Sequence, residues 1–190
     1  MHFTKLEGIG NDYIYVDGIH HEVDTSPAFI QALCDRHFGV GSDGLIVLDT
    51  SQIADFKMRM FNSDGSEGRM CGNGIRGLAK FAYEHHLTTK TRMTFETLAG
   101  MRSVELIIND GQVTGGTVDM GQPSLKTADL PMNVASETFC DSIVMIGNQA
   151  YRGTAVSMGN PHFVILIDQI PEDITAIGEC FNDRDRKSVV

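Results

Sequence analysis

The chain has 190 residues, of which 42% are hydrophobic, so it can bury a substantial core in one domain or two small ones. Its formal net charge of -10 and pI near 5.0 argue against a nucleic-acid footprint or binding to an anionic membrane. No apolar run approaches the roughly 20 residues that span a bilayer, and the N-terminus lacks the basic-then-apolar pattern of a signal peptide. Composition therefore favours small-molecule chemistry.

The first half of the chain predicts two helices. Residues 27–36 follow Ser26 as a cap, begin with a proline and have Gly39 beyond their end. The second helix starts at Cys71, after a turn-rich approach, because Ile75, Leu78, Ala79, Ala82 and Tyr83 recur at helical spacing.

Strands dominate the rest, which predicts an α+β fold, and Asn109-Asp110-Gly111 is typical of a hairpin turn. The glycine-rich segment 8–12 is predicted as a turn between strands, since it lacks the third glycine and the helix of a dinucleotide-binding motif. A hinge is expected near 117–123. The predicted strands are residues 13–16, 45–48, 56–61, 93–97, 104–108, 143–146 and 163–167.

Four cysteines lie far apart, and no pair has C-x-x-C spacing, which favours a reducing cytoplasm and free thiols. The seven histidines show neither a His-Glu-x-x-His helix nor Cys/His zinc spacing, so no metal site is predicted. The cysteines are Cys34, Cys71, Cys140 and Cys180.

Cys71 is the leading candidate for acid/base chemistry. A helix start offers unpaired N–H groups and the positive end of the helix dipole, which bind a carboxylate and favour thiolate over thiol. Gly72 and Asn73 follow it, and glycine lets a ligand approach the backbone closely. The alternative for Cys71 is a buried structural cysteine.

Short amides beside glycines or turns, at Asn11, Asn62 and Asn73, could grip ammonium and carboxylate groups. His162 follows Gly-Asn-Pro and leads into an apolar run, so we expect it at the mouth of a strand, where loops build sites. A structural histidine is the alternative.

Five motifs occur in order along nearly the whole chain, and together they carry a family resemblance that none carries alone. The chain resembles the N-terminal two-thirds of diaminopimelate epimerase. The motifs are Lys5-x-x-Gly8-x-Gly10-Asn11-Asp12, Gly39-x-Gly41-x-Asp43-Gly44, Phe61-Asn62-x-Asp64-Gly65-Ser66, Met70-Cys71-Gly72-Asn73-Gly74 and Gly159-Asn160-Pro161-His162.

The resemblance implies two similar lobes, each a curved, mostly antiparallel sheet around a central helix, with the active site between them and a homodimer as the assembly. It implies conversion of LL-diaminopimelate to meso-diaminopimelate in lysine and peptidoglycan-precursor synthesis, without pyridoxal phosphate, metal or any other cofactor. One cysteine thiolate removes the α-proton while a second cysteine returns one on the opposite face, because inversion needs a base on each face.

By motif position, the resemblance implies that Cys71 is one acid/base and that His162 assists a cysteine's ionisation. Gly72 and Asn73 would bind the substrate's α-carboxylate through backbone groups. The substrate's polar ends would be held by Asn11, Asn62 and Asn160. Two positions depart from the pattern: Gly44 stands where some members have glutamine, and Gly77 where many have a second cysteine, the latter with no expected catalytic consequence.

The family's Glu-Arg pair and Ala-Cys-Gly-Thr-Gly segment, with the partner cysteine, are not found in this sequence. Cys140 and Cys180 lack a following glycine, and Cys34 is expected to be buried in a helix. We expect an N-terminal epimerase lobe over residues 1–119 and a partial C-terminal lobe over 120–184. Residues 185–190 break the family pattern and can be encoded by a sequencing-adapter sequence, so a non-native tail and an inactive chain are expected.

Three other functions fit parts of the pattern. One is a different cofactor-independent racemase or isomerase of the same fold, of the proline racemase or phenazine-pathway kind. A second is a thiol hydrolase with Cys71 as nucleophile and His162 as base. The third is a non-catalytic lobe that binds an amino acid.

Overall fold

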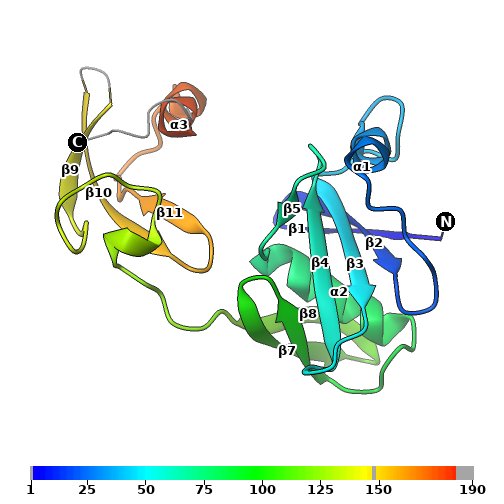
Figure 1. Cartoon of the computed structure of the whole chain (residues 1–190). Coiled ribbons are helices and arrows are strands. Elements are labelled where there is room, and N and C mark those ends of the chain that lie inside the picture. The colour runs from blue at the N-terminus through cyan, green and yellow to red at the C-terminus, as the bar shows by residue number, and fades with distance from the viewer. Residues whose placement is uncertain (1, 147–148, 183–190) are drawn as a thin grey trace. The chain divides into compact units, whose positions relative to one another are not determined.

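The computed structural model describes residues 2–146 and 149–182 and divides the chain into two compact units, residues 1–121 and 122–190. The expected tail at 185–190 lies outside the described residues. None of the helices in the described residues is long and apolar enough to cross a bilayer. Each unit is mixed α+β (Figure 1).

In the described part of unit 1, eight strands form one sheet in the order β1-β2-β3-β4-β6-β7-β8, with β5 paired to β4. The β2–β3 and β4–β6 pairs are parallel and the other pairs antiparallel. The elements are β1 (Thr4–Gly8), β2 (Asn11–Asp17), α1 (Pro27–Cys34), β3 (Gly44–Asp49), β4 (Phe56–Asn62), β5 (Glu67–Gly68), α2 (Gly72–Glu84), β6 (Arg92–Thr97), β7 (Gly100–Asn109) and β8 (Gln112–Asp119).

The sheet of unit 1 curls around α2. This helix contacts β1 and β8, the two ends of the strand order, as well as β2, β3 and β7 (Figure 1). Its apolar stripe is fully buried, including Ile75, Leu78 and Ala82, each 0% exposed. The predicted helix after Cys71 is confirmed, and its start lies beside the end of β1 and the start of β2, where Gly8 is close to Asn73 and Asn11 to Cys71.

Strands β2 and β3 are buried on both faces, which explains their continuous apolar runs. Side chains alternate along a strand, so Tyr15 and Ile46 face the core around α2, while Ile14 and Leu45 join a second core that contains residues of α1. Helix α1 therefore covers the outer face of the sheet near β2 and β3.

Helix α1 begins as predicted, with Ser26 as N-cap accepting a hydrogen bond from the Phe29 N–H, but it ends at Cys34 rather than residue 36. The reason is Asp35, whose Oδ1 accepts hydrogen bonds from the His37 and Phe38 N–H groups, each at 2.7 Å. These bonds give the backbone an alternative to another helical turn.

In the described part of unit 2, three strands form an antiparallel sheet in the order β11-β10-β9. The last predicted strand, residues 163–167, is wrong in its bounds, because β11 pairs only with residues 154–157 of β10 and stops at Val164. Beyond it, Leu166 is 91% exposed. The elements are a 3₁₀ helix η1 (Thr127–Asp129), β9 (Ser142–Ile146), β10 (Gln149–Ser157), β11 (Pro161–Val164) and α3 (Ile174–Asn182).

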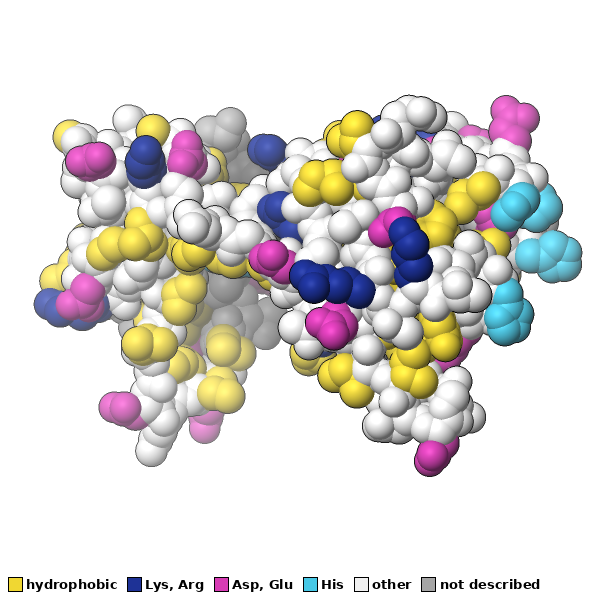
Figure 2. All heavy atoms as spheres, turned by 90° about the horizontal axis from the view of Figure 1, so that it is seen from below, with side chains coloured by type: hydrophobic (Ala, Val, Ile, Leu, Met, Phe, Trp, Pro, Cys, Tyr) yellow, Lys and Arg dark blue, Asp and Glu magenta, His cyan; other side chains and the backbone are white. Residues whose placement is uncertain are grey.

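The surface carries both positively and negatively charged side chains. On the face shown in Figure 2, Lys and Arg side chains stand beside Asp and Glu side chains. The described residues include ion pairs of this kind, such as Lys80 with Glu84 (2.8 Å) and Lys57 with Glu96 (3.2 Å). Such exposed pairs contribute little to stability, about 0–1 kcal/mol each.

The predicted turn at residues 8–12 is a two-residue hairpin between β1 and β2. Gly8 pairs with Asn11, and the two central residues, Ile9 and Gly10, have φ of 57° and 77°. Positive φ is costly for a β-branched residue, and Ile9 is 85% exposed, so it gains little burial in return. Strain in this turn is thus stored two residues before Asn11.

We expect Ile9→Asn to stabilise the chain by about 1 kcal/mol, because asparagine tolerates positive φ in such turns. Chemical denaturation measures the change. Ile53→Asn is the matched control, since Ile53 is 70% exposed but is not among the described residues with positive φ. An equal gain in both variants would show that replacing an exposed apolar side chain by a polar one, and not relief of the strained turn, causes the effect.

Candidate active site

Cys71 is the N-cap residue of α2. Its backbone is extended (φ -132°, ψ 120°), and its Sγ accepts a hydrogen bond from the Gly74 N–H at 3.3 Å. The Cys71 carbonyl accepts the first helical bond, from the Ile75 N–H at 2.9 Å. The thiol is partly buried and free. The sequence prediction that this cysteine lies at a helix start is confirmed.

The first turn of α2 leaves two backbone donors available. The N–H groups of Gly72 and Asn73 have no hydrogen-bond acceptor among the described residues, as expected for the first positions of a helix. A Cβ on Gly72 would make only ordinary van der Waals contact with the Met120 Sδ, at 3.4 Å. The two N–H groups lie at the positive end of the helix dipole, where an anion is favoured.

Asn11, at the start of β2, joins the same site. The Cys71 thiol donates to the Asn11 Oδ1 at 3.4 Å, across 60 residues of sequence. The amide nitrogen of Asn11 donates to the Asp43 Oδ2 at 2.8 Å. The structure thus brings together a cysteine and an asparagine that were singled out separately in the sequence, and it adds Asp43.

Two buried tyrosines also face Cys71, and sequence reasoning missed them. Burial, and then the electrostatic interaction with Cys71, raises the pKa of Tyr13 and of Tyr15. The Tyr15 hydroxyl donates to the Gly74 carbonyl at 3.1 Å. Side chains alternate between the two faces of a strand, so the sequence already placed Asn11, Tyr13 and Tyr15 on one face of β2.

Gly44, which stands where some family members have glutamine, is closely surrounded by other atoms. A Cβ at Gly44 would lie 2.9 Å from the Tyr13 Cε1 and 2.1 Å from the Phe61 carbonyl oxygen. The Tyr13 ring therefore occupies the space beside Gly44, and a side chain there requires the backbone to move.

The other two asparagines of unit 1 make local contacts. Asn62, at the end of β4, donates to the Ser66 Oγ at 3.0 Å. The Oδ1 of Asn73 accepts from the Arg76 Nη2 at 2.5 Å, one turn along α2. Asn62 pairs across strands with Gly44, which in turn pairs with Tyr13, so it lies at the same end of the sheet as Tyr13.

Asn160 and His162 belong to unit 2. The His162 Nε2 and the Asn160 Oδ1 are 3.1 Å apart, and both side chains are exposed. As expected, His162 lies at the start of a strand: it is the second residue of β11, directly after the loop at residues 158–160, and it pairs with Val156. That His162 assists a cysteine stays a prediction.

The remaining cysteines differ from Cys71 in position. Cys34, the last residue of α1, is buried as predicted, and burial raises the pKa of its thiol, which also accepts from the Ser42 Oγ at 3.3 Å. Cys140 is exposed just before β9. Cys180 lies inside α3, away from its start.

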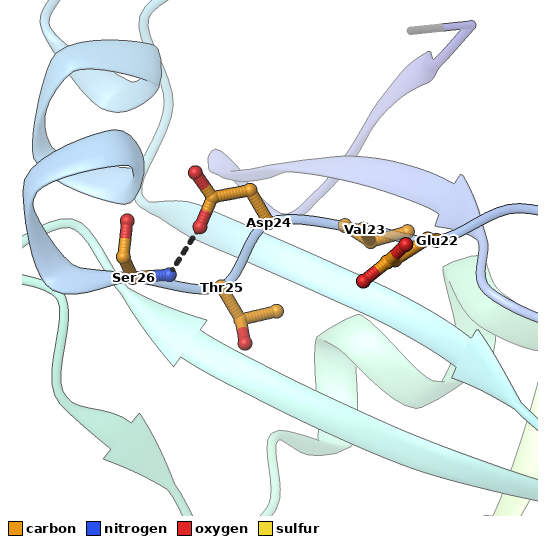
Figure 3. A pocket seen from close by; sticks show the side chains of 5 residues that line it. All are labelled: Glu22, Val23, Asp24, Thr25 and Ser26. Carbon is orange, nitrogen blue, oxygen red and sulfur yellow. Dashed lines mark hydrogen bonds between the residues drawn. The ribbon is translucent and has the colours of Figure 1, made fainter.

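A surface hollow lies before α1, lined by the five consecutive residues 22–26 (Figure 3). The Asp24 carboxylate accepts from the Ser26 N–H at 2.8 Å, and this bond lowers the pKa of Asp24. The hollow contains none of the predicted site residues, and its hydrogen bond helps to orient the Ser26 cap. Among the described residues, no group of three or more potential metal ligands occurs.

Solved structures with a similar fold include a hydroxyproline epimerase from Agrobacterium vitis, with a TM-score of 0.58 and 14% identity, over 86% of this chain and 50% of that one. A phenazine biosynthesis protein of the PhzF family from Bacillus anthracis has a TM-score of 0.51 and 22% identity, over 86% and 54%. At these identities the likeness defines the class of fold, an α+β fold shared by these enzymes.

The sequence relatives define the family. A model of the family described as diaminopimelate epimerase matches residues 3–126. The diaminopimelate epimerase of Methanococcus maripaludis is 46% identical over 182 residues, and that of Desulfovibrio desulfuricans is 44% identical over 188, each covering 95% of this chain. The chain belongs to the diaminopimelate epimerase family, and it spans 66% of the length of these two relatives.

Proposed function

We propose that this chain provides one half of a cofactor-independent, two-base site for the epimerisation of LL-diaminopimelate to meso-diaminopimelate, in lysine and peptidoglycan-precursor synthesis. Cys71 is the acid/base on one face of the substrate. In this proposal residues 1–119 are the lobe that carries Cys71, residues 120–184 belong to a second, similar lobe, and the complete enzyme is a cytoplasmic homodimer.

The observation that carries the proposal is the position of Cys71 directly before two available backbone donors. The α-proton of an amino acid is far less acidic than a thiol, so its removal needs stabilisation of the carbanion. A substrate α-carboxylate on the N–H groups of Gly72 and Asn73 would gain negative charge as the proton leaves. Donors already aimed at that charge lower the barrier.

The other predicted residues take supporting roles in the proposal. Asn11, Asn62 and Asn160 hold the polar ends of the substrate, and His162 assists the ionisation of a cysteine. Inversion requires a second base on the opposite face, and none of Cys34, Cys140 and Cys180 begins a helix in the manner of Cys71. The curated relatives extend beyond the matched stretch for about a third of their length, and we propose that a base from that part completes the site in the family.

The 190-residue chain is expected to bind meso-diaminopimelate without interconverting the isomers. Calorimetry with meso-diaminopimelate measures binding, and chiral chromatography after incubation with LL-diaminopimelate measures turnover. Cys71→Ala is the matched variant, and it should retain binding because backbone groups hold the carboxylate. Production of meso-diaminopimelate by the 190-residue chain would contradict the two-base assignment.

Incorporation of solvent deuterium at the α-carbon of the substrate distinguishes the proposed epimerase from another isomerase of the same fold and from a thiol hydrolase. Exchange with diaminopimelate, but not with proline or hydroxyproline, supports the proposed substrate. A trapped acyl-enzyme on Cys71, with no exchange of the α-hydrogen, supports a thiol hydrolase instead. Binding without either reaction, in a chain extended to the relatives' full length, supports a non-catalytic lobe.

A further inference from the structure

The Asn11 side chain lies between Asp43 and Cys71, bonded to both. Its Nδ2 donates to the Asp43 Oδ2 at 2.8 Å, and its Oδ1 accepts from the Cys71 thiol at 3.4 Å. An amide has a donor end and an acceptor end, whereas an ionised carboxylate only accepts. The reversed amide would place two acceptors face to face, so Asp43 decides which end of Asn11 faces the sulfur.

Asp43 is itself held in place from two sides. Its Oδ2 also accepts from the Asp12 N–H at 3.1 Å, and its Oδ1 accepts from the Arg36 Nη2 at 2.9 Å. Arg36 bridges to the Asp12 carboxylate at 2.7 Å, and Lys5 pairs with the same carboxylate at 3.0 Å. These side chains are partly exposed, so the pairs add little stability, but together they leave Asp43 few alternative positions.

The two ends of the amide would have opposite effects on Cys71. An oxygen acceptor stabilises the S–H form and repels a thiolate, whereas an N–H donor stabilises the thiolate. The Gly74 N–H already donates to the same sulfur at 3.3 Å. The sulfur therefore has a donor on one side and, because of Asp43, an acceptor on the other.

We propose that Asp43 is a positioning residue for Cys71: by fixing the Asn11 amide it keeps an oxygen acceptor, and not an N–H donor, on the sulfur. This inference deepens the proposed acid/base role of Cys71. It concerns the ionisation of the thiol alone and is tested without diaminopimelate.

Other ionisable groups also act on the sulfur. The Tyr13 hydroxyl of β2 interacts by hydrogen bonding with both the sulfur and the Asn11 side chain, Tyr15 interacts with the sulfur electrostatically, and Arg76 of α2 acts on Tyr15. The neighbouring charged side chains on β1, β2 and the segment before β3 are Lys5, Glu7, Asp12 and Arg36. These residues are the same in wild type and in the variants at positions 11 and 43. The interaction of Tyr13 with Asn11 is lost in both Asn11→Ala and the double variant, so the comparison of those two isolates Asp43.

The test is the pH profile of alkylation of the 190-residue chain by iodoacetamide, read at the Cys71 peptide by mass spectrometry so that the other cysteines do not contribute. In Asp43→Ala, Asn11 can turn its Nδ2 to the sulfur. We expect the midpoint of the profile to fall and the rate at neutral pH to rise about threefold or more. Asn11→Ala should also lower the midpoint, because it removes the acceptor.

The double variant Asn11→Ala/Asp43→Ala separates positioning from simple charge. If Asp43 acts through the amide, the double variant matches Asn11→Ala. Asp12→Asn is the control, since it removes a carboxylate from the same network and leaves the Asn11–Asp43 bond in place; its midpoint should stay near that of wild type.

Three results would overturn the proposal. The first is an unchanged or raised midpoint in Asp43→Ala, and the second is an equal shift from the Asp43→Ala change in the wild-type and Asn11→Ala backgrounds. The third is a rate change at every pH with no shift of the midpoint, because such a change reports access of the reagent. If Asp43→Ala does not fold, an unchanged midpoint in Asn11→Ala overturns it as well. Failure of the proposed epimerisation is read separately, by exchange of the substrate's α-hydrogen.

Discussion

Cys71→Ala and Cys71→Ser are both expected to abolish epimerisation in a chain extended by the remaining third of the Methanococcus maripaludis enzyme. General acid–base groups contribute about 100- to 10,000-fold to a rate, so we expect turnover to fall by about 1,000-fold or more. The substrate should still bind, because the N–H groups of Gly72 and Asn73 remain. Chiral chromatography of the diaminopimelate isomers measures the rate.

The same pair of variants separates chemistry from helix capping. Cys71→Ala removes the acceptor of the Gly74 N–H, and loss of an N-cap costs about 1 kcal/mol. Serine is a preferred N-cap residue, so Cys71→Ser should keep or exceed the wild-type stability in thermal unfolding. If both variants are inactive but only Cys71→Ala loses stability, the loss of turnover is due to the missing thiol and not to the missing helix cap. Near-wild-type turnover in either variant would contradict its role as a base.

Gly77→Ala is expected to destabilise unit 1 by about 1–2 kcal/mol, although alanine is favoured over glycine in a helix by about 1 kcal/mol. A Cβ at this position would lie 2.3 Å from the Tyr15 hydroxyl oxygen and 2.7 Å from its Cζ. Tyr15 is only 2% exposed, and its hydroxyl holds the Gly74 carbonyl at 3.1 Å. Overpacking of this kind costs about 1–3 kcal/mol, which outweighs the gain in helix propensity.

Urea denaturation of Gly77→Ala measures this balance. Gly178→Ala is the matched control, because Gly178 lies inside α3 and, apart from its own helix backbone and chain neighbours, no described atom lies within 4 Å of the added Cβ; the change should be neutral or stabilising. Tyr15→Phe in the Gly77→Ala background removes the closest contact and should recover part of the loss. Equal stabilisation of both helices by alanine would show that Tyr15 moves away at little cost.

The elements that the sequence pattern predicted correctly are those whose formation depends on neighbouring residues. The stripe of α2, the cap at Ser26 and the turn at Asn109-Asp110-Gly111 each depend on residues close in sequence, and Asp110 and Gly111 adopt the positive φ that this turn needs. The strand β10 and the helix α3 were not predicted. In α3 a glycine interrupts the apolar pattern, and β10 reads Gln-Ala-Tyr-Arg-Gly-Thr-Ala-Val-Ser, where alternation is weak.

By itself the sequence determined the class of fold, the helix start at Cys71, the family and the residues expected to carry its chemistry, because these depend on local spacing and on motifs in order. The tertiary structure decided the parallel pairing of β2 with β3 and of β4 with β6, and the curl of the sheet around α2. It also decided which neighbours Cys71 meets. Asn11 reaches the thiol from 60 residues away, and Asp43 reaches Asn11 from 32. Such contacts follow from long-range strand pairing and core packing, which no local periodicity encodes.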